Sequence, residues 1–568
     1  MKMGSLATAL ALVGCAAWPL ACSSDSAPPS GADASTEGDG GGTGGKGAGG
    51  TSKGGSGGGG AGKAGASSSN GGAAGNGGRG GAGGAATGGV DAGAPTEMPD
   101  ASVGPDASDS GAPTPDGGAK PDGAANCADL RCYPYPKVLY PALNPASDDK
   151  AMLGKFLFWD EQMGELDSMA CGTCHRSFAG GSDPRTNDPG AHLPGPDGVL
   201  DPEPTPPTSD DIRGAQGVLA CASPSMVTGT SPQVTTRKPP SYFDAMFNPR
   251  NFWDGRAGDC NAGDGNLGGC FYDPDSLVLD AHAKPLIAGS LDPVTNRMVG
   301  AALEAQSVGP PVNPKEMSCS DQTWAKLEAK LTQVTPLHYA KAGSIPQDMK
   351  DFAAQYPTYP KMFAQAFGST AKLNASDPDD VINSRRIAFA IATHERRLTS
   401  DQTPFDRWVA GDDSALTAQQ LRGYQAFMGV GRCQFCHPPP LFTDSAFHNI
   451  GFHKPSWDSG RSAITLQSSD LGKFKTPTLR NVGLREQYGL LHEGDGPGHD
   501  LNSILLLYKQ GGQRTDPDIE PFIDPGLLAV PLTAGDIADI IEFLRNGLTD
   551  PRVKAETAPF DRPHFNTE

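Results

Sequence analysis

Apolar residues recur every three or four positions along several stretches of the chain, which is the spacing of one face of an α-helix. In 321–334 this spacing is kept by Trp324, Leu327, Leu331 and Val334. A longer amphipathic pattern of the same kind runs through 379–398. Both stretches therefore predict helices with one buried face.

A further helix is predicted at 532–548, where the apolar spacing follows a capping box. Thr533 and Asp536 stand three apart, so each side chain can bond the other residue's backbone N–H at the helix start. The apolar positions that follow are Ile537, Ile540, Ile541 and Leu544. The aliphatic run SILLLYKQGG at 503–512 predicts one more packed helix. Long Gly/Pro/Asp loops and few alternating strand patterns complete a mainly α fold.

The N-terminal part of the chain shows no such periodicity. Residues 23–126 are rich in Gly, Ser and Pro, with too little apolar surface to offset the entropy of ordering, so we expect a disordered tether. Residues 1–22 combine Lys2, an apolar run and small residues before a cysteine, which is typical of a lipoprotein signal. Cys15 and Cys22 are the two candidates for the lipidated cysteine. The residues before Cys15 fit a lipoprotein cleavage motif better, whereas cleavage at Cys22 leaves the exported chain with no unpaired thiol. We expect export to the periplasm or the outer membrane, with membrane contact only through this lipid anchor.

The remaining length of about 440 residues is enough for two domains with sizeable cores. We place them at 127–400 and 401–568. The net charge of −20 disfavours nucleic acid as a partner, because the phosphate backbone is itself anionic.

Two pentapeptides carry the strongest chemical signal. Residues 171–175 read CGTCH (the first motif) and residues 433–437 read CQFCH (the second motif). C-x-x-C-H attaches c-type haem: two thiols bond the porphyrin, and the following histidine ligates iron from the proximal side. The residues with these roles are Cys171, Cys174 and His175, then Cys433, Cys436 and His437. A zinc ribbon requires its cysteine pairs about 15–20 residues apart, and a thioredoxin-like dithiol gives no reason for the histidine. We therefore predict two covalent haems.

Six other cysteines belong to the exported part, and an even number in an oxidising compartment predicts up to three disulfides. They are Cys127, Cys132, Cys221, Cys260, Cys270 and Cys319. The near pairs Cys127–Cys132 and Cys260–Cys270 are candidates, and the connectivity stays open.

Several stretches together resemble the bacterial di-haem cytochrome c peroxidases and their relative MauG. They are LGKFLFWDEQM (153–163), FNPRNFWDGRA (247–257), LEAQSVGPPVNPKEM (303–317), the segment 400–437, FKTPTLRNVGL (474–484) and 491–512. The resemblance covers about residues 138–548 in the family's order. It implies two cytochrome c-like domains with one haem each, the N-terminal haem meeting peroxide and the C-terminal haem transferring electrons.

The resemblance also implies site residues. Gln306 and Glu316 match the glutamine and glutamate over the peroxidatic haem, with Glu316 as the acid/base and Gln306 as a hydrogen-bonding residue. Trp253 matches a tryptophan between the haems, a candidate electron relay. Classical members carry a distal histidine after the first motif, and His192 is the only histidine in the corresponding loop. If His192 does not ligate the iron of the first haem, that iron has an open coordination position, as in MauG.

Three departures from the classical peroxidases bear on function. Tyr508 stands where they carry a distal methionine on the second haem, as tyrosine does in MauG; a phenolate favours ferric iron and storage of oxidising equivalents. Lys238 stands where an asparagine ligates the interhaem calcium, so calcium is in doubt and the ammonium could occupy its place. The insertion around 258–300 matches nothing in the family.

Three functions follow as hypotheses. The first is a peroxidase that reduces hydrogen peroxide with electrons from a small cytochrome c or cupredoxin. The second is MauG-like, peroxide-dependent oxidation of aromatic residues on a partner protein, which Tyr508 favours. The third is a non-catalytic electron carrier, which has no need of Gln306 and Glu316.

Overall fold

The computed structural model describes part of the chain in detail. The described residues are 130–141, 144–200, 211–222, 226–258, 260–261, 297–298, 301–319, 321–368, 382–494 and 500–568. Several sequence predictions lie outside them: the signal segment 1–22 with Cys15 and Cys22, the tether 23–126, Cys127, Cys270 and most of the 258–300 insertion.

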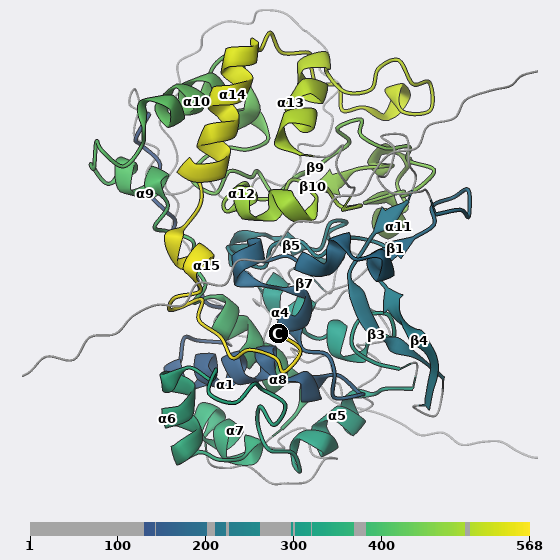
Figure 1. The fold of residues 1–568 in the computed structure, drawn as a ribbon, viewed down its shortest axis with the longest axis vertical. Coiled ribbons are helices and arrows are strands. Elements are labelled where there is room, and N and C mark those ends of the chain that lie inside the picture. Colours follow the sequence, from purple (N-terminus) through teal and green to yellow (C-terminus); the bar gives the residue numbers. More distant parts are fainter. Residues whose placement is uncertain are drawn as a thin grey trace, which may run out of the picture. The chain divides into compact units, whose positions relative to one another are not determined.

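The described part is mainly helical (Figure 1). Its α-helices are α1 (Asp148–Trp159), α2 (Cys171–Cys174), α4 (Ala302–Ser307), α5 (Trp324–Leu331), α6 (Gln347–Gln355), α7 (Tyr359–Phe367), α8 (Ser384–Glu395), α9 (Pro404–Val409), α10 (Ala418–Met428), α11 (Ser462–Thr465), α12 (Val482–Arg485), α13 (Leu501–Gln510), α14 (Ala534–Glu542) and α15 (Pro551–Ala555). Among the described residues, none of these helices has the length and apolar character needed to cross a membrane.

The strands form small antiparallel pairs. They are β1 (His192–Leu193) with β2 (Ile212–Arg213), β3 (Gln216–Ala222) with β4 (Met226–Val234), β5 (Arg250–Asn251) with β6 (Ala257–Gly258), β7 (Cys260–Asn261) with β8 (Arg297–Met298), and β9 (Phe447–His448) with β10 (Phe474–Lys475). The longest pair, β3 and β4, carries register shifts between Gln216 and Cys221.

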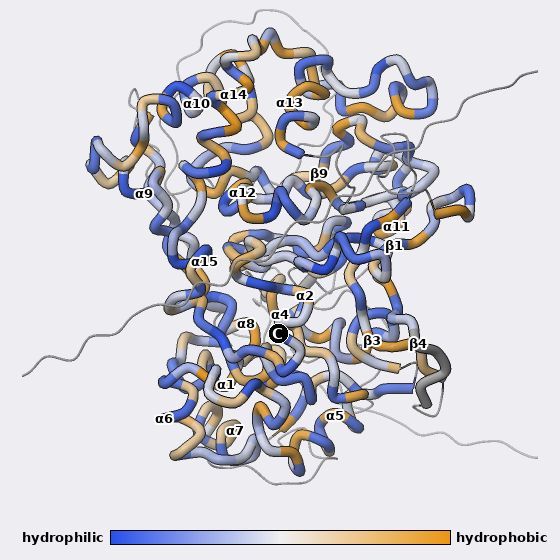
Figure 2. Tube along the Cα trace, viewed as in Figure 1, coloured by the Kyte–Doolittle hydropathy of each residue, from blue (hydrophilic) through white to orange (hydrophobic). Residues whose placement is uncertain are grey.

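The predicted helices are present. α5 and α8 are shorter than their sequence patterns, α14 continues as a π-helical turn over Phe543–Gly547, and α13 has the length of its pattern but begins two residues earlier. α5 begins after Thr323, whose hydroxyl accepts from the Lys326 backbone N–H. α14 has the predicted capping box of Thr533 and Asp536, with both reciprocal hydrogen bonds formed. Figure 2 shows apolar and polar positions alternating around α10, α13 and α14. Such a helix must bury one face, and packing against neighbouring helices satisfies that requirement.

Two main hydrophobic cores result. In the first, α1 packs along α8 although the two helices are far apart in sequence (Figure 1). In the second, α10 and α13 both pack against α14. The first core includes residues between Leu153 and Leu398 and the second includes residues between Phe405 and Leu548. The last segment of the chain returns to the first core, where Val553 and Phe565 are buried.

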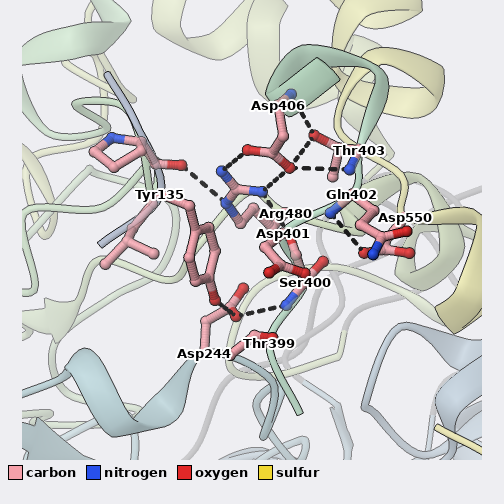
Figure 3. Close-up of polar contacts among 12 residues, drawn as sticks. Tyr135, Asp244, Thr399, Ser400, Asp401, Gln402, Thr403, Asp406, Arg480 and Asp550 are labelled. Atoms are coloured by element: carbon pink, nitrogen blue, oxygen red, sulfur yellow. Dashed lines mark hydrogen bonds and ion pairs between the residues drawn. The ribbon is translucent and has the colours of Figure 1, made fainter. Parts of the chain in front are cut away.

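Arg480 organises the segment that links the two cores (Figure 3). Its guanidinium is buried and forms a two-pronged ion pair with Asp406, at 2.7 and 2.8 Å. The same group donates to the Ser400 carbonyl at 2.6 Å. The Ser400 backbone N–H in turn donates to Asp244, which also accepts from the Tyr135 hydroxyl. The partners of a buried charge are costly to remove, so this network fixes the link between the cores.

A disulfide joins Cys221 of β3 to Cys319. It is neither of the two near pairs that the sequence suggested. Of those pairs, Cys127 and Cys270 lie outside the described residues. The bond ties β3 to the loop that carries Glu316, three residues before Cys319.

Candidate haem sites

The second motif folds as a single 3₁₀ turn over Cys433–Phe435, followed by His437. The Nδ1 atom of His437 lies 2.8 Å from the carbonyl oxygen of Phe442. Because a carbonyl only accepts, Nδ1 carries the proton and Nε2 keeps its lone pair. This is the state in which an imidazole ligates a metal, with the second nitrogen fixing the ring.

A cavity of about 570 Å³ opens over the second motif. Its lining includes both cysteines of the motif, His437 and Tyr508. Tyr508 lies in the last turns of α13, and burial raises the pKa of its phenol above the ordinary value. The phenol therefore stays protonated unless a cation lies against its oxygen. The structure thus brings Tyr508 and His437 to one cavity, as a pair of axial ligands requires.

The first motif is built in a parallel way. α2 carries Cys171 and Cys174, and the Thr173 hydroxyl accepts from the Ala170 backbone N–H at 2.9 Å to hold the turn. The Nδ1 atom of His175 lies 3.0 Å from the Gly181 carbonyl oxygen, so its Nε2 is also left as the lone-pair nitrogen.

The four motif thiols fit covalent haem attachment better than a thiolate metal site. None of them is in a disulfide in the part of the chain that the structure describes. Burial raises the pKa of Cys174 and of Cys433 to about 12, so both stay protonated at neutral pH. Zinc binds thiolates, whereas haem attachment consumes the thiols. Both motifs therefore have the side chains to hold a c-type haem, with Cys171 and Cys436 completing the two pairs.

Glu316 lies beside the first motif. Its carboxylate is one of the charges that, after burial, raise the pKa of Cys171 and Cys174. Burial raises the pKa of Glu316 itself, and the nearby positive charge of Arg256 lowers it. The Asn313 side-chain amide donates to Glu316 at 3.1 Å. A half-buried carboxyl whose pKa is raised above its ordinary value holds a proton more readily than a solvated one, as a general acid/base requires.

The backbone around Glu316 is also fixed. The Val218 N–H of β3 donates to the Glu316 carbonyl at 2.9 Å. A Cβ at Gly217 would lie 2.0 Å from the Lys315 carbonyl oxygen, so only glycine permits this approach. Gln306 lies in the last turn of α4 and is half-buried. Its predicted hydrogen bonding to a bound substrate stays a prediction.

Trp253 lines the cavity of the second motif. Its indole N–H donates to the Lys238 carbonyl at 2.8 Å, and its ring centre lies 6.1 Å from that of His492. Arg256, whose charge acts on Glu316, follows three residues later. The short segment from Trp253 to Arg256 therefore reaches from the second cavity to the surroundings of the first motif.

Lys238 is fully buried and its ammonium donates to backbone carbonyls. The distance from Nζ to the Tyr488 oxygen is 2.5 Å, and Gly489 provides the second acceptor. Burial and the charge of Arg485 lower the pKa of Lys238 to about 7, with Asp183 opposing them. Backbone carbonyl oxygens are also calcium ligands. The ammonium thus lies against oxygen atoms of the type that would bind a cation.

His192 lies in β1, half-buried, with its backbone paired to Arg213. Its ligation of the first iron stays a prediction.

Asn313 is a residue that the sequence analysis missed. The signal was present, because Asn313 precedes Glu316 by three residues in NPKE and an amide at that spacing can reach back to a carboxylate.

Much of the chain is similar to known proteins. The family model for di-haem cytochrome c peroxidase matches residues 148–414. The chain is 27% identical over 431 residues to the methylamine utilization protein MauG of Methylorubrum extorquens, covering 75% of this chain and 84% of that protein. Over much of its length the chain is therefore similar to the di-haem cytochrome c peroxidases and MauG. This similarity identifies the protein as an oxidoreductase of the cytochrome c peroxidase type, and it implies c-type haem cofactors.

Two further proteins are similar to the chain. Cytochrome c551 peroxidase of Nitrosomonas europaea is 26% identical over 357 residues, covering 62% of this chain and 71% of that protein. A crystal structure of a MauG-like protein associated with microbial copper homeostasis matches with a TM-score of 0.47 and 21% identity, covering 75% of this chain and 97% of that chain.

Proposed function

We propose that this protein is a di-haem peroxidase that reduces hydrogen peroxide at the first motif and relays electrons through the second. The observation that carries the proposal is the half-buried Glu316, whose pKa is raised and whose charge acts on Cys171 and Cys174. A carrier that only moves electrons has no use for an acid/base beside one of its haems, so the non-catalytic alternative is disfavoured.

Glu316 would transfer the proton that peroxide cleavage needs. When bound, the haem supplies the iron redox chemistry that breaks the O–O bond. Hydrogen peroxide takes up two electrons and two protons and leaves as two water molecules. Glu316 accepts a proton from one oxygen of the peroxide and returns it to the other oxygen. Asn313 holds the carboxylate in place for both transfers. Gln306 hydrogen-bonds the bound peroxide.

Trp253 would carry electrons between the two sites, because it lines the second cavity and is followed closely by Arg256 near Glu316. The electrons would come from a small cytochrome c or cupredoxin. The lipoprotein-type N-terminus supports an exported location, periplasmic or at the outer membrane, where such donors occur.

Tyr508 favours a second candidate function. Its phenol lines the cavity that also contains His437. An anionic oxygen ligand stabilises ferric iron and makes the second haem a poor acceptor for a high-potential donor. Such a protein would instead use peroxide to oxidise aromatic residues of a partner protein, as the resemblance to MauG suggests.

One experiment separates the candidates. The purified diferric protein is mixed with one equivalent of hydrogen peroxide, and absorbance is followed with and without prior reduction of one haem. Immediate reaction of the diferric protein, with a long-lived change at both haems, supports the MauG-like function. Reaction only after reduction, with turnover in the presence of reduced cytochrome c or cupredoxin, supports the peroxidase. Absence of reaction in both states contradicts both enzymatic proposals.

A further inference from the structure

Three side chains from two loops converge beside the second cavity, which His453 and His492 help to line. His453 follows β9, and His492 and Glu493 precede α13. The Nε2 atom of His492 lies 3.3 Å from Oε1 of Glu493, and Nδ1 of His453 lies 4.0 Å from the same oxygen. These ligand atoms all lie within 4.8 Å of one another. The cluster lies outside the two haem motifs.

The hydrogen bonds of His453 leave a lone pair directed into the cluster. Its Nε2 faces the backbone carbonyl oxygen of Asp458 at 3.4 Å. A carbonyl accepts only, so Nε2 carries the proton and Nδ1, on the Glu493 side, is the unprotonated nitrogen. A lone pair that faces a carboxylate oxygen is repulsive unless a cation lies between them.

His492 provides the second, independent observation. Its side chain is only 6% exposed, and Nε2 forms no hydrogen bond among the described residues, although Oε1 of Glu493 lies 3.3 Å away. The ring is held in place by Phe474, stacked at 3.6 Å between centres. A buried polar atom without a hydrogen bond requires an explanation, and a bound ion is one of the few available. Nε2 of His492 faces Oε1 of Glu493, and the lone pair on Nδ1 of His453 faces the same oxygen.

We propose that His453, His492 and Glu493 bind one divalent transition-metal ion of the zinc class. Two imidazole nitrogens and one carboxylate oxygen are the donors that such an ion prefers, with water as a fourth ligand. With bonds of about 2.0–2.1 Å, ligand atoms in a tetrahedral site lie about 3.3–3.5 Å apart. The observed spacing therefore requires closure by less than about 1.5 Å, within the range of side-chain rotation.

The surroundings fit a cation in this position. The Asp458 carboxylate lies 3.9 Å from Nε2 of His492 and is paired with Arg237 through two hydrogen bonds. The Asp458 carbonyl oxygen orients His453 from behind, which is the usual outer-shell contact of a metal-binding histidine. The ion would lie beside Trp253, whose ring centre is 6.1 Å from that of His492.

The test uses the haem-loaded protein without a histidine tag. It is equilibrated with Zn²⁺, freed of unbound metal by gel filtration, and analysed for zinc and iron by mass spectrometry. We expect one zinc for each two irons. The ratio should fall at least tenfold in His453→Ala and in Glu493→Gln. The control His338→Ala removes an exposed histidine elsewhere and should keep the ratio.

Two additions make the result decisive. X-ray absorption at the zinc edge should show nitrogen and oxygen neighbours at about 2.0–2.1 Å, and excess Ca²⁺ should not displace the zinc because it prefers oxygen ligands. If His453→Ala does not fold, Glu493→Gln, which keeps its shape, decides the question. Zinc-free wild-type protein, or variants that retain the full ratio, would overturn the proposal. Neither outcome depends on peroxide chemistry.

Discussion

The side-chain amide of Asn313 donates a hydrogen bond across 3.1 Å to Oε1 of Glu316. Burial raises the pKa of Glu316, and this bond favours the ionised form that accepts a proton. In Asn313→Ala the carboxyl loses a donor, so the pKa rises further and the acidic limb of the pH–rate profile moves to higher pH. Peroxide turnover should fall about tenfold, the value of one hydrogen bond to a charged group.

Asn546→Ala is the matched control for this change. Asn546 also donates to a glutamate, Glu542, but on the exposed surface of the chain. Its replacement should leave both turnover and the pH profile unchanged. An equal loss in the two variants, or a lower rate without movement of the pH profile, would show that Asn313 has only a structural role.

Replacement of Glu316 itself should have a larger effect. Glu316→Gln keeps the size of the side chain and its contact with Asn313 but removes proton exchange. Peroxide turnover should fall by about 10²–10⁴-fold, the typical contribution of general acid–base catalysis. Steady-state assays are normalised to haem content, with the exposed Glu520→Gln as control. A rate within about twofold of wild type would exclude Glu316 as the acid/base.

Local signals could be read from the sequence, whereas contacts between distant segments could not. The Thr533–Asp536 capping box and its helix depend on neighbours within one turn, and the structure contains both. The Cys221–Cys319 bond spans a sequence separation of 98, so its partners are set by the packing of β3 against the Glu316 loop. Sequence alone allows many connectivities and gives no reason to prefer this one.

The candidate sites show the same division. The haem motifs are contiguous, so the roles of their cysteines and histidines follow from spacing. Convergence of Tyr508 and His437 on one cavity needs α13 to fold back over the second motif, which a family resemblance suggested and periodicity could not. The cluster of His453 and His492 had no signal, because the placement of two irregular loops depends on tertiary contacts such as the stacking of Phe474.

Tyr508→Phe tests the axial ligand of the second haem. The change removes the phenol oxygen and preserves the packing of the ring in α13. If the oxygen ligates iron, the low-spin ferric absorbance and electron paramagnetic resonance signals of that haem should change, and Tyr508→Met should raise its reduction potential. Tyr356→Phe, remote from the second cavity, should leave the spectra unchanged. Identical spectra for wild type and Tyr508→Phe would return Tyr508 to a packing role.

Lys238→Asn tests whether the ammonium takes the place of a calcium ion. The variant exchanges a cation for an amide oxygen beside the carbonyls of Tyr488 and Gly489, which are calcium-type ligands. At calcium about 100 times above its Kd, the variant should gain about 2.7 kcal/mol of stability in urea unfolding. Wild type and the exposed control Lys509→Asn should not respond to calcium or to chelator. A calcium response of wild type equal to that of the variant would contradict the prediction.

His448 predicts a pH dependence of stability. Its ring is held between Asp444 at 2.9 Å and Asp524 at 2.7 Å, and these hydrogen bonds are the largest causes that raise its pKa to about 12. Cys436 also contributes to this raised pKa, but less than the two carboxylates do. In the haem-loaded protein Cys436 is a thioether, so the two carboxylates remain as the cause. Because the folded pKa exceeds the unfolded value of about 6.5, the stabilisation is complete below pH of about 6.5, declines steadily as the pH rises above it, and is fully lost only above the folded pKa. The urea midpoint should therefore fall less between pH 6 and 9 in His448→Gln than in wild type or in the exposed control His338→Gln. An equal fall of the midpoint in all three proteins would contradict a stabilising charge on His448 between the two carboxylates.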